Sequence, residues 1–220
     1  MCFSATASFG ASVCLTGLGI ASLRMARTPG QYGFAGIPLV FGVQQFAEGV
    51  VWLSLEHESM SSFSNAASLA FLIFAQVVWP IWLPTSFVML EEDPKRRKIL
   101  RLFLIPGIIV AFYFLYNLVT LPLVTEAIDH HVFYRLAFPI TVVPYAAALY
   151  LSATLIPPLL SRTYKIQMIG VVLFASYVIA RLFFQPSLIS VWCFLAIVIG
   201  ALVFLVLRDE KRRMEVKLVS

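Results

Sequence analysis

Long apolar runs separated by short polar segments dominate the chain. A membrane-spanning helix needs about 20 mostly apolar residues, each rising about 1.5 Å. Seven runs of this kind are present, at roughly 7–26, 36–55, 66–90, 99–121, 132–158, 166–184 and 187–207. The composition agrees, since 60% of the 220 residues are hydrophobic and 12% are charged, against about 25% charged in soluble domains. The pattern predicts an all-α polytopic membrane protein: a single domain of seven transmembrane helices over residues 1–220, with the lipid bilayer as its first partner.

The basic residues predict the orientation of these helices. With seven spans, 14 of the 16 Lys and Arg residues fall on one side of the membrane. They are Arg24, Arg27, Lys95, Arg96, Arg97, Lys98, Arg101, Arg162, Lys165, Arg208, Lys211, Arg212, Arg213 and Lys217. Because basic residues accumulate on the cytoplasmic side, we expect the N-terminus outside, the C-terminus inside and residues 208–220 as a basic cytoplasmic tail. The net charge of +5 then needs no nucleic-acid partner.

Polar residues inside the apolar runs define a candidate ligand-binding site. Gln44, Gln45 and Glu48 lie three or four residues apart, so they share one helical face, which Trp52 extends toward the outside. Further candidates at a similar depth are Gln76, Tyr116, Asn117, Arg135, Tyr177 and Arg181. Ionisable residues within a membrane usually face the bundle interior or a water-filled cavity.

Two interpretations of this polar group remain open. In the first, an outward-facing cavity floored by Glu48 and guarded by Arg135 and Arg181 binds a small solute or an ion. In the second, Glu48 and one arginine form a structural ion pair that fixes helix packing, as buried pairs can do.

A second candidate site is a divalent metal centre at the outer face. Its predicted ligands are His57, Asp129, His130 and His131, which offer the nitrogen and oxygen donors that such metals accept. The same residues could simply be solvated surface, because no pair has the His-x-x-x-His spacing of zinc hydrolases.

The last run has no lysine to bind retinal, and the chain has no phosphate-binding loop for a nucleotide. The sequence singles out no catalytic residue.

Prolines and a weak repeat add two expectations about the helices. Pro80 and Pro84 should kink the third span, and Pro139 and Pro144 the fifth. The third and seventh runs end in the similar segments LEEDPKRR (90–97) and LRDEKRR (207–213), which suggests a parallel 3+1+3 repeat. The alternative is that the orientation rule alone makes the two ends alike.

The opening residues Met-Cys-Phe-Ser-Ala-Thr-Ala-Ser (1–8) are similar to the start of a family of uncharacterised bacterial multi-pass membrane proteins. The segments at 44–52 and 190–194 also resemble that family's pattern. The resemblance covers most of the chain and implies a location in the bacterial inner membrane. It implies no activity.

Three classes of function fit these observations. The first is a small-solute or ion transporter, or a binding and sensing bundle. The second is an intramembrane metal-dependent hydrolase with its site at the outer face. The third is a structural subunit of a membrane complex, or a homo-oligomer, in which the 19 Phe residues pack against lipid or a partner.

Overall fold

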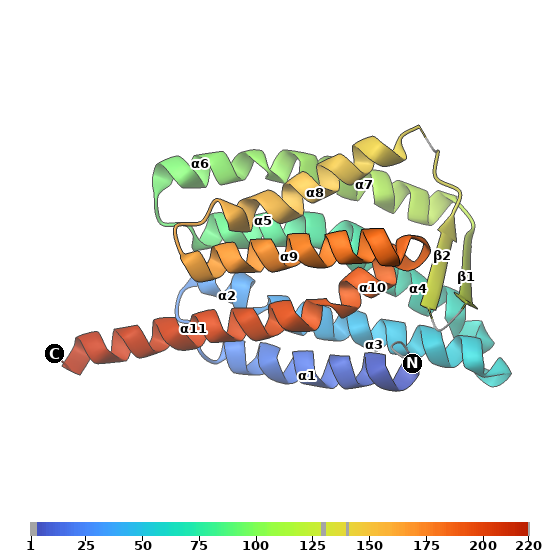
Figure 1. The fold of residues 1–220 in the computed structure, drawn as a ribbon, viewed down its shortest axis with the longest axis horizontal. Coiled ribbons are helices and arrows are strands. Elements are labelled where there is room, and N and C mark those ends of the chain that lie inside the picture. Colours follow the sequence, from blue (N-terminus) through green and yellow to red (C-terminus); the bar gives the residue numbers. More distant parts are fainter. Residues whose placement is uncertain (1–3, 129–130, 140, 220) are drawn as a thin grey trace.

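The computed structural model describes residues 4–128, 131–139 and 141–219. Helices form most of it and run side by side, so that the connections gather at two ends of one bundle (Figure 1). The helical elements are α1 (Ala5–Leu23), α2 (Pro29–Ala35), α3 (Ile37–Glu56), η1 (Glu58–Phe63), α4 (Ser64–Leu72), η2 (Ile73–Val78), α5 (Trp79–Leu90), α6 (Pro94–Leu102), α7 (Leu104–Thr120), α8 (Val143–Leu159), α9 (Tyr164–Phe183), η3 (Gln185–Ser187), α10 (Leu188–Phe194) and α11 (Ala196–Val219).

Within the described residues, six helical stretches are long and apolar enough to cross a membrane. They are Ala5–Leu23, Pro29–Glu56, Glu58–Leu90, Pro94–Thr120, Tyr164–Phe183 and Gln185–Arg213. The apolar helix α8 is shorter, with 17 residues, or about 25 Å of length against a hydrocarbon core of about 30 Å. The prediction of a helical membrane protein agrees with these lengths.

The expected helix at 132–158 is wrong in its first part. Residues Leu123–Ile128 (β1) and His131–Leu136 (β2) form an antiparallel hairpin in which Leu123 pairs with Leu136. Their β-branched and aromatic residues favour strands. Pro139 lies in a non-helical segment rather than in a kinked helix, and Pro144 occupies the first turn of α8, where proline is tolerated.

The two ends of the bundle differ in content (Figure 1). The end that holds the start of α6, the start of α9 and the C-terminal end of α11 is called the basic end, because it carries the basic segments named above. The end that holds β1 and β2 is called the hairpin end. Thr125 on β1 donates a hydrogen bond to Ser68 on α4 (2.9 Å), and Tyr134 on β2 stacks on Phe71, with ring centroids 5.0 Å apart. These contacts fix the hairpin to the bundle.

Pro80 disrupts the α-helical hydrogen bonding of the segment just before it, and this segment forms a π-helical turn, η2. In a π-helix the carbonyl of residue 75 would accept from the N–H of residue 80, which proline lacks. The Tyr150 hydroxyl on α8 donates to that carbonyl instead, at 2.6 Å. The carbonyl oxygen of Pro80 in turn lies against Gly107 on α7, where a Cβ would come within 2.0 Å of it. The missing N–H of Pro80 and the missing side chain of Gly107 together allow α5, α7 and α8 to pack closely against one another.

Candidate functional site

A buried polar network joins α3 to α5 and α10. Gln44 accepts a hydrogen bond from the Trp79 indole N–H (2.6 Å) and donates one to the Cys193 sulfur (3.0 Å). One turn further along α3, the Glu48 carboxylate accepts from the Gln45 amide (3.0 Å) and is also hydrogen-bonded by the Ser190 hydroxyl. Gln44, Gln45 and Glu48 are at most 1% exposed. The shared face that the helical spacing predicts is therefore fully inside the bundle.

Glu48 has no ion-pair partner among the described residues. Arg135, one predicted partner, pairs instead with Glu126 across the hairpin, at 3.1 Å and with both side chains well exposed. Arg181, the other, is exposed on α9. The predicted structural ion pair between Glu48 and an arginine is absent from the described part of the chain, and two neutral side chains supply the hydrogen bonds of the carboxylate.

A cavity of about 430 Å³ lies beside this network at the hairpin end and is called the hairpin-end cavity. It is bounded by η2, α7, β2, α8, α9 and α10. Seven aromatic side chains line it: Tyr113, Phe114, Tyr134, Phe138, Tyr150, Tyr177 and Trp192. Cys193 also lines it and joins it to Gln44 through the hydrogen bond described above. Small-molecule sites commonly have such apolar walls and volumes of about 300–1,000 Å³.

Three polar atoms of this cavity's lining residues are buried without a hydrogen-bond partner in the described structure. They are the side-chain oxygen of Gln76 and the hydroxyls of Tyr113 and Tyr134. A buried polar group that makes no hydrogen bond costs about 1–3 kcal/mol, so such groups are rare without a reason. Burial also raises the pKa of the Tyr134 hydroxyl well above its usual range, so this group stays neutral and able to donate.

Some of the other predicted site residues line the hairpin-end cavity, and the rest lie elsewhere in the bundle. Of the ten predicted ligand-binding residues, Gln76, Arg135 and Tyr177 line the hairpin-end cavity. Glu48 is not among its lining residues, so it does not form the floor expected from the sequence. Trp52 is buried on α3. Asn117 is buried as well, and its amide donates to a carbonyl one turn back in α7. Tyr116 is 68% exposed and takes no part in the site.

Two of the four predicted metal ligands fall outside the residues that the structure describes. Asp129 and His130 lie outside the described residues. His57 is exposed at the C-terminal end of α3, and His131 begins β2 with its ring edge-to-face on Phe184 (5.2 Å between centroids). Among the residues that the structure describes, no group of three or more His, Cys, Asp or Glu side chains could hold a metal ion.

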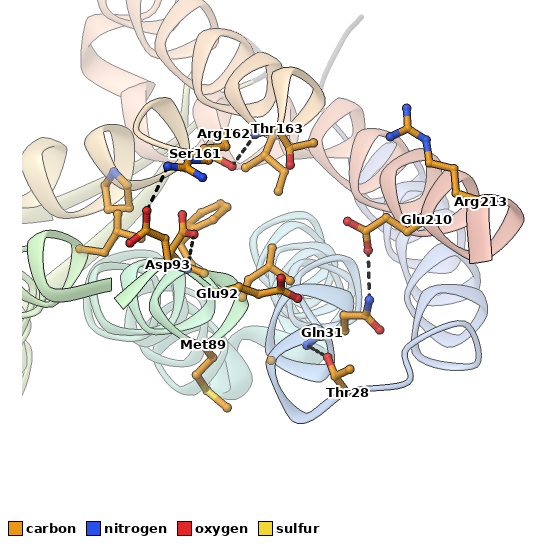
Figure 2. A pocket seen from close by; sticks show the side chains of 17 residues that line it. Thr28, Gln31, Met89, Glu92, Asp93, Ser161, Arg162, Thr163, Glu210 and Arg213 are labelled. Atoms are coloured by element: carbon orange, nitrogen blue, oxygen red, sulfur yellow. Dashed lines mark hydrogen bonds and ion pairs between the residues drawn. The ribbon is translucent and has the colours of Figure 1, made fainter. Parts of the chain in front are cut away.

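A larger cavity of about 630 Å³ lies at the basic end (Figure 2) and is called the basic-end cavity. Figure 2 shows Asp93 pointing toward Arg162, and Glu210 toward Gln31, across this space. The first pair is an ion pair of 3.1 Å, and in the second the Gln31 amide donates to Glu210 at 3.1 Å. The first contact ties the start of α6 to the α8–α9 connection, and the second ties α2 to α11.

The two cavities differ in how well their polar groups are paired. No residue that lines the basic-end cavity has a buried, unpartnered side-chain atom in the described structure, whereas three residues of the hairpin-end cavity do. With its aromatic walls, the hairpin-end cavity is the better candidate for a small-molecule site. Sequence reasoning missed most of its aromatic walls, because Phe114, Phe138, Tyr150 and Trp192 look like ordinary core residues until the fold brings them together.

Long apolar helices packed into one bundle define the class of this chain: it is a helical membrane protein. The chain belongs to a family of unknown function, DUF6629, whose model matches residues 1–218. No curated protein matches the chain, and no solved structure matches it. The function must therefore be argued from the site itself.

Proposed function

We propose that the protein binds a small solute in the hairpin-end cavity, as a transporter or as a binding and sensing bundle. The observation that carries this proposal is a cavity of about 430 Å³ with seven aromatic side chains in its wall. Aromatic walls would bury the apolar surface of a bound solute.

The buried network behind the cavity supports this function indirectly. Cys193 and Ile189 on α10 line the cavity, and Ser190 between them is hydrogen-bonded to Glu48 on α3. The network therefore holds α10 against α3 and keeps one wall of the cavity in place. A site whose walls are held by buried hydrogen bonds is preorganised, and preorganisation lowers the entropic cost of binding.

The orientation of the helices in the membrane is part of the same proposal. In the proposed topology, α8 and the six longer stretches make seven spans, with the hairpin end outside and the basic end in the cytoplasm of a bacterial inner membrane. The cavity would then take its solute from the outer side. Reporter fusions test this: a fusion at Ser220 is expected to report cytoplasm and one in the segment around Ser61 the exterior. The opposite pattern would reverse the side from which the solute enters. The parallel 3+1+3 arrangement of the helices stays a prediction.

A solute screen with a cavity-filling variant tests the binding itself. Ala147 and Ala148 are neighbours on α8, but only Ala147 lines the cavity, while Ala148 is exposed on the surface of the bundle. A solute that binds the folded protein at 100 times its Kd stabilises it by about 2.7 kcal/mol. We expect at least one solute to raise the Tm of the wild type and of Ala148→Trp, but not that of Ala147→Trp. Equal shifts in both variants would place the site elsewhere, and no shift with any solute would contradict the proposal.

A further inference from the structure

A third and much smaller cavity lies inside the bundle and is called the middle cavity. Its volume is about 30 Å³, which is room for about one water molecule. Tyr150, Trp192 and Cys193 line both this cavity and the hairpin-end cavity. The two cavities therefore adjoin one another at these three side chains.

The three cavities follow one another along the same helices, which pack side by side in the bundle (Figure 1). From the hairpin-end cavity through the middle cavity to the basic-end cavity, the lining residues include Ala75, Leu83 and Phe87 on η2 and α5, and Ala147, Thr154 and Pro157 on α8. Residues of α9 and of the pair α10 and α11 line all three cavities in the same order. On α5 and α8, only about 4.5–6 Å of helix separates the lining of the middle cavity from that of the basic-end cavity.

Three of these four helical stretches are interrupted along the line of cavities. The π-helical turn η2 and Pro84 interrupt the first, Pro157 and Pro158 lie inside α8, and Leu195 separates α10 from α11. A proline inside a helix removes a main-chain hydrogen bond, and helices bend at prolines and π-helical turns. Transporters commonly build their solute sites from interrupted helices of this kind.

The side chains of Tyr150 and Trp192 close the line between the hairpin-end and middle cavities. Their rings meet edge-to-face with centroids 5.9 Å apart. The Tyr150 hydroxyl on α8 donates to the carbonyl of residue 75 in η2 (2.6 Å), and the Trp192 indole N–H on α10 donates to the Ser176 hydroxyl on α9 (3.0 Å). Because each hydrogen bond joins two of the lining helices, a bend in either helix moves the side chain that it holds.

Resting on the proposed solute-binding function, we infer that the protein is a transporter rather than a sensor. Its solute passes from the hairpin-end cavity through the middle cavity to the basic-end cavity, and Tyr150 and Trp192 form the gate at the first step. The route is closed in this structure, because the middle cavity holds no more than about one water molecule. It opens when the interrupted helices bend, so the middle cavity becomes accessible from each face of the membrane in turn.

Labelling of the middle cavity from the two faces of the membrane tests this inference. The chain carries Thr154→Cys with its native cysteines replaced by serine, and the probe is 2-(trimethylammonium)ethyl methanethiosulfonate, which does not cross membranes. The matched control is Ala153→Cys, because Ala153 is the neighbouring residue on α8, is equally buried and lines none of the three cavities. In right-side-out and in inverted vesicles, we expect Thr154→Cys to react at least about tenfold faster than the control, which reacts only through local unfolding.

Labelling of Thr154→Cys from one face only, or from neither, would overturn the inferred transport. If Thr154→Cys does not fold, Leu173→Cys probes the same cavity from α9, because Leu173 is buried and lines the middle cavity as well. The same two-sided labelling is expected there, and one-sided labelling or none would again overturn the inference.

A change at Trp192 tests the gate. Trp192→Phe keeps an aromatic ring and loses the N–H that Ser176 accepts, so it should speed the labelling of Thr154→Cys from the face of the hairpin end by about two- to tenfold, the effect of one lost hydrogen bond. Trp82→Phe is the matched control, because the Trp82 indole also loses a hydrogen bond, to Gly33, but lines none of the three cavities. Equal rates in the two variants would overturn the assignment of the gate.

The outcomes separate this inference from the proposed function. If a solute from the screen stabilises the wild type but not Ala147→Trp, while Thr154→Cys is labelled from one face only, the protein binds its solute without transporting it and only the inference fails. If no solute stabilises the wild type, the proposed binding fails, whatever the labelling shows.

Discussion

Replacing Gly107 by alanine is expected to destabilise the protein strongly, because α7 approaches α5 through this glycine. An added Cβ would lie 2.0 Å from the Pro80 carbonyl oxygen, 3.1 Å from its carbon and 3.3 Å from the Ala153 Cβ. Unstrained carbon contacts need about 3.5–4.0 Å, so the two helices must separate by about 1 Å or more. The nearest atoms are main-chain atoms of a helix and cannot rotate away. Overpacking typically costs about 1–3 kcal/mol, and we expect the upper end of that range here.

Thermal unfolding in detergent, followed by size-exclusion chromatography of heated samples, measures this effect. A loss of about 3 kcal/mol corresponds to a Tm lowered by about 6–12 °C for a chain of this size. Gly10→Ala on α1 is the matched control, because a Cβ there meets nothing within 4 Å, and removing a helical glycine is neutral or favourable by about 0.5–1 kcal/mol. If Gly107→Ala is as stable as Gly10→Ala, the close packing of α5 against α7 described above is wrong.

Substitutions at three further positions separate buried from exposed polar contacts. Gln44→Leu leaves the Trp79 indole N–H without its acceptor and should lower stability by about 1–3 kcal/mol, measured as a fall in Tm. Glu48→Gln keeps one oxygen for Ser190 and should cost less than Glu48→Leu, which removes both; equal losses would contradict the described hydrogen bonds. Arg135→Ala breaks an exposed ion pair and should change stability by less than about 1 kcal/mol, so a large fall in its Tm would mean that this arginine is structural.

The polar face of α3 could be predicted from the sequence because it rests on local geometry. Residues three and four apart share a face in any α-helix, so Gln44, Gln45 and Glu48 lie together whatever surrounds them. Their partners could not be predicted, since Trp79, Ser190 and Cys193 come from distant helices and have no spacing relation to α3. Depth in the membrane grouped Arg181 with Glu48, but depth does not specify which side of a helix faces the core, and Arg181 is exposed.

The hairpin was missed for a related reason. Most residues of β2 fall within the apolar run at 132–158, and hydropathy alone does not separate a strand from a helix. The informative signals were Pro122 and Pro139 on either side of a segment rich in β-branched and aromatic residues. The aromatic cavity depends on this hairpin, because Tyr134 and Arg135 reach it from β2. A prediction without the hairpin could not contain the cavity.

The most direct test of the central claim is the accessibility of residue 147 from outside the cell. Ala147→Cys and Ala148→Cys are labelled with a membrane-impermeant maleimide in intact cells, and labelling of the unsubstituted protein is subtracted as the background from the native cysteines. The account predicts that Ala147→Cys is labelled, that a solute from the screen slows this labelling, and that Ala148→Cys is not labelled because it faces lipid. Absence of labelling at Ala147→Cys, or labelling that no bound solute slows, would contradict an outward-facing solute-binding cavity.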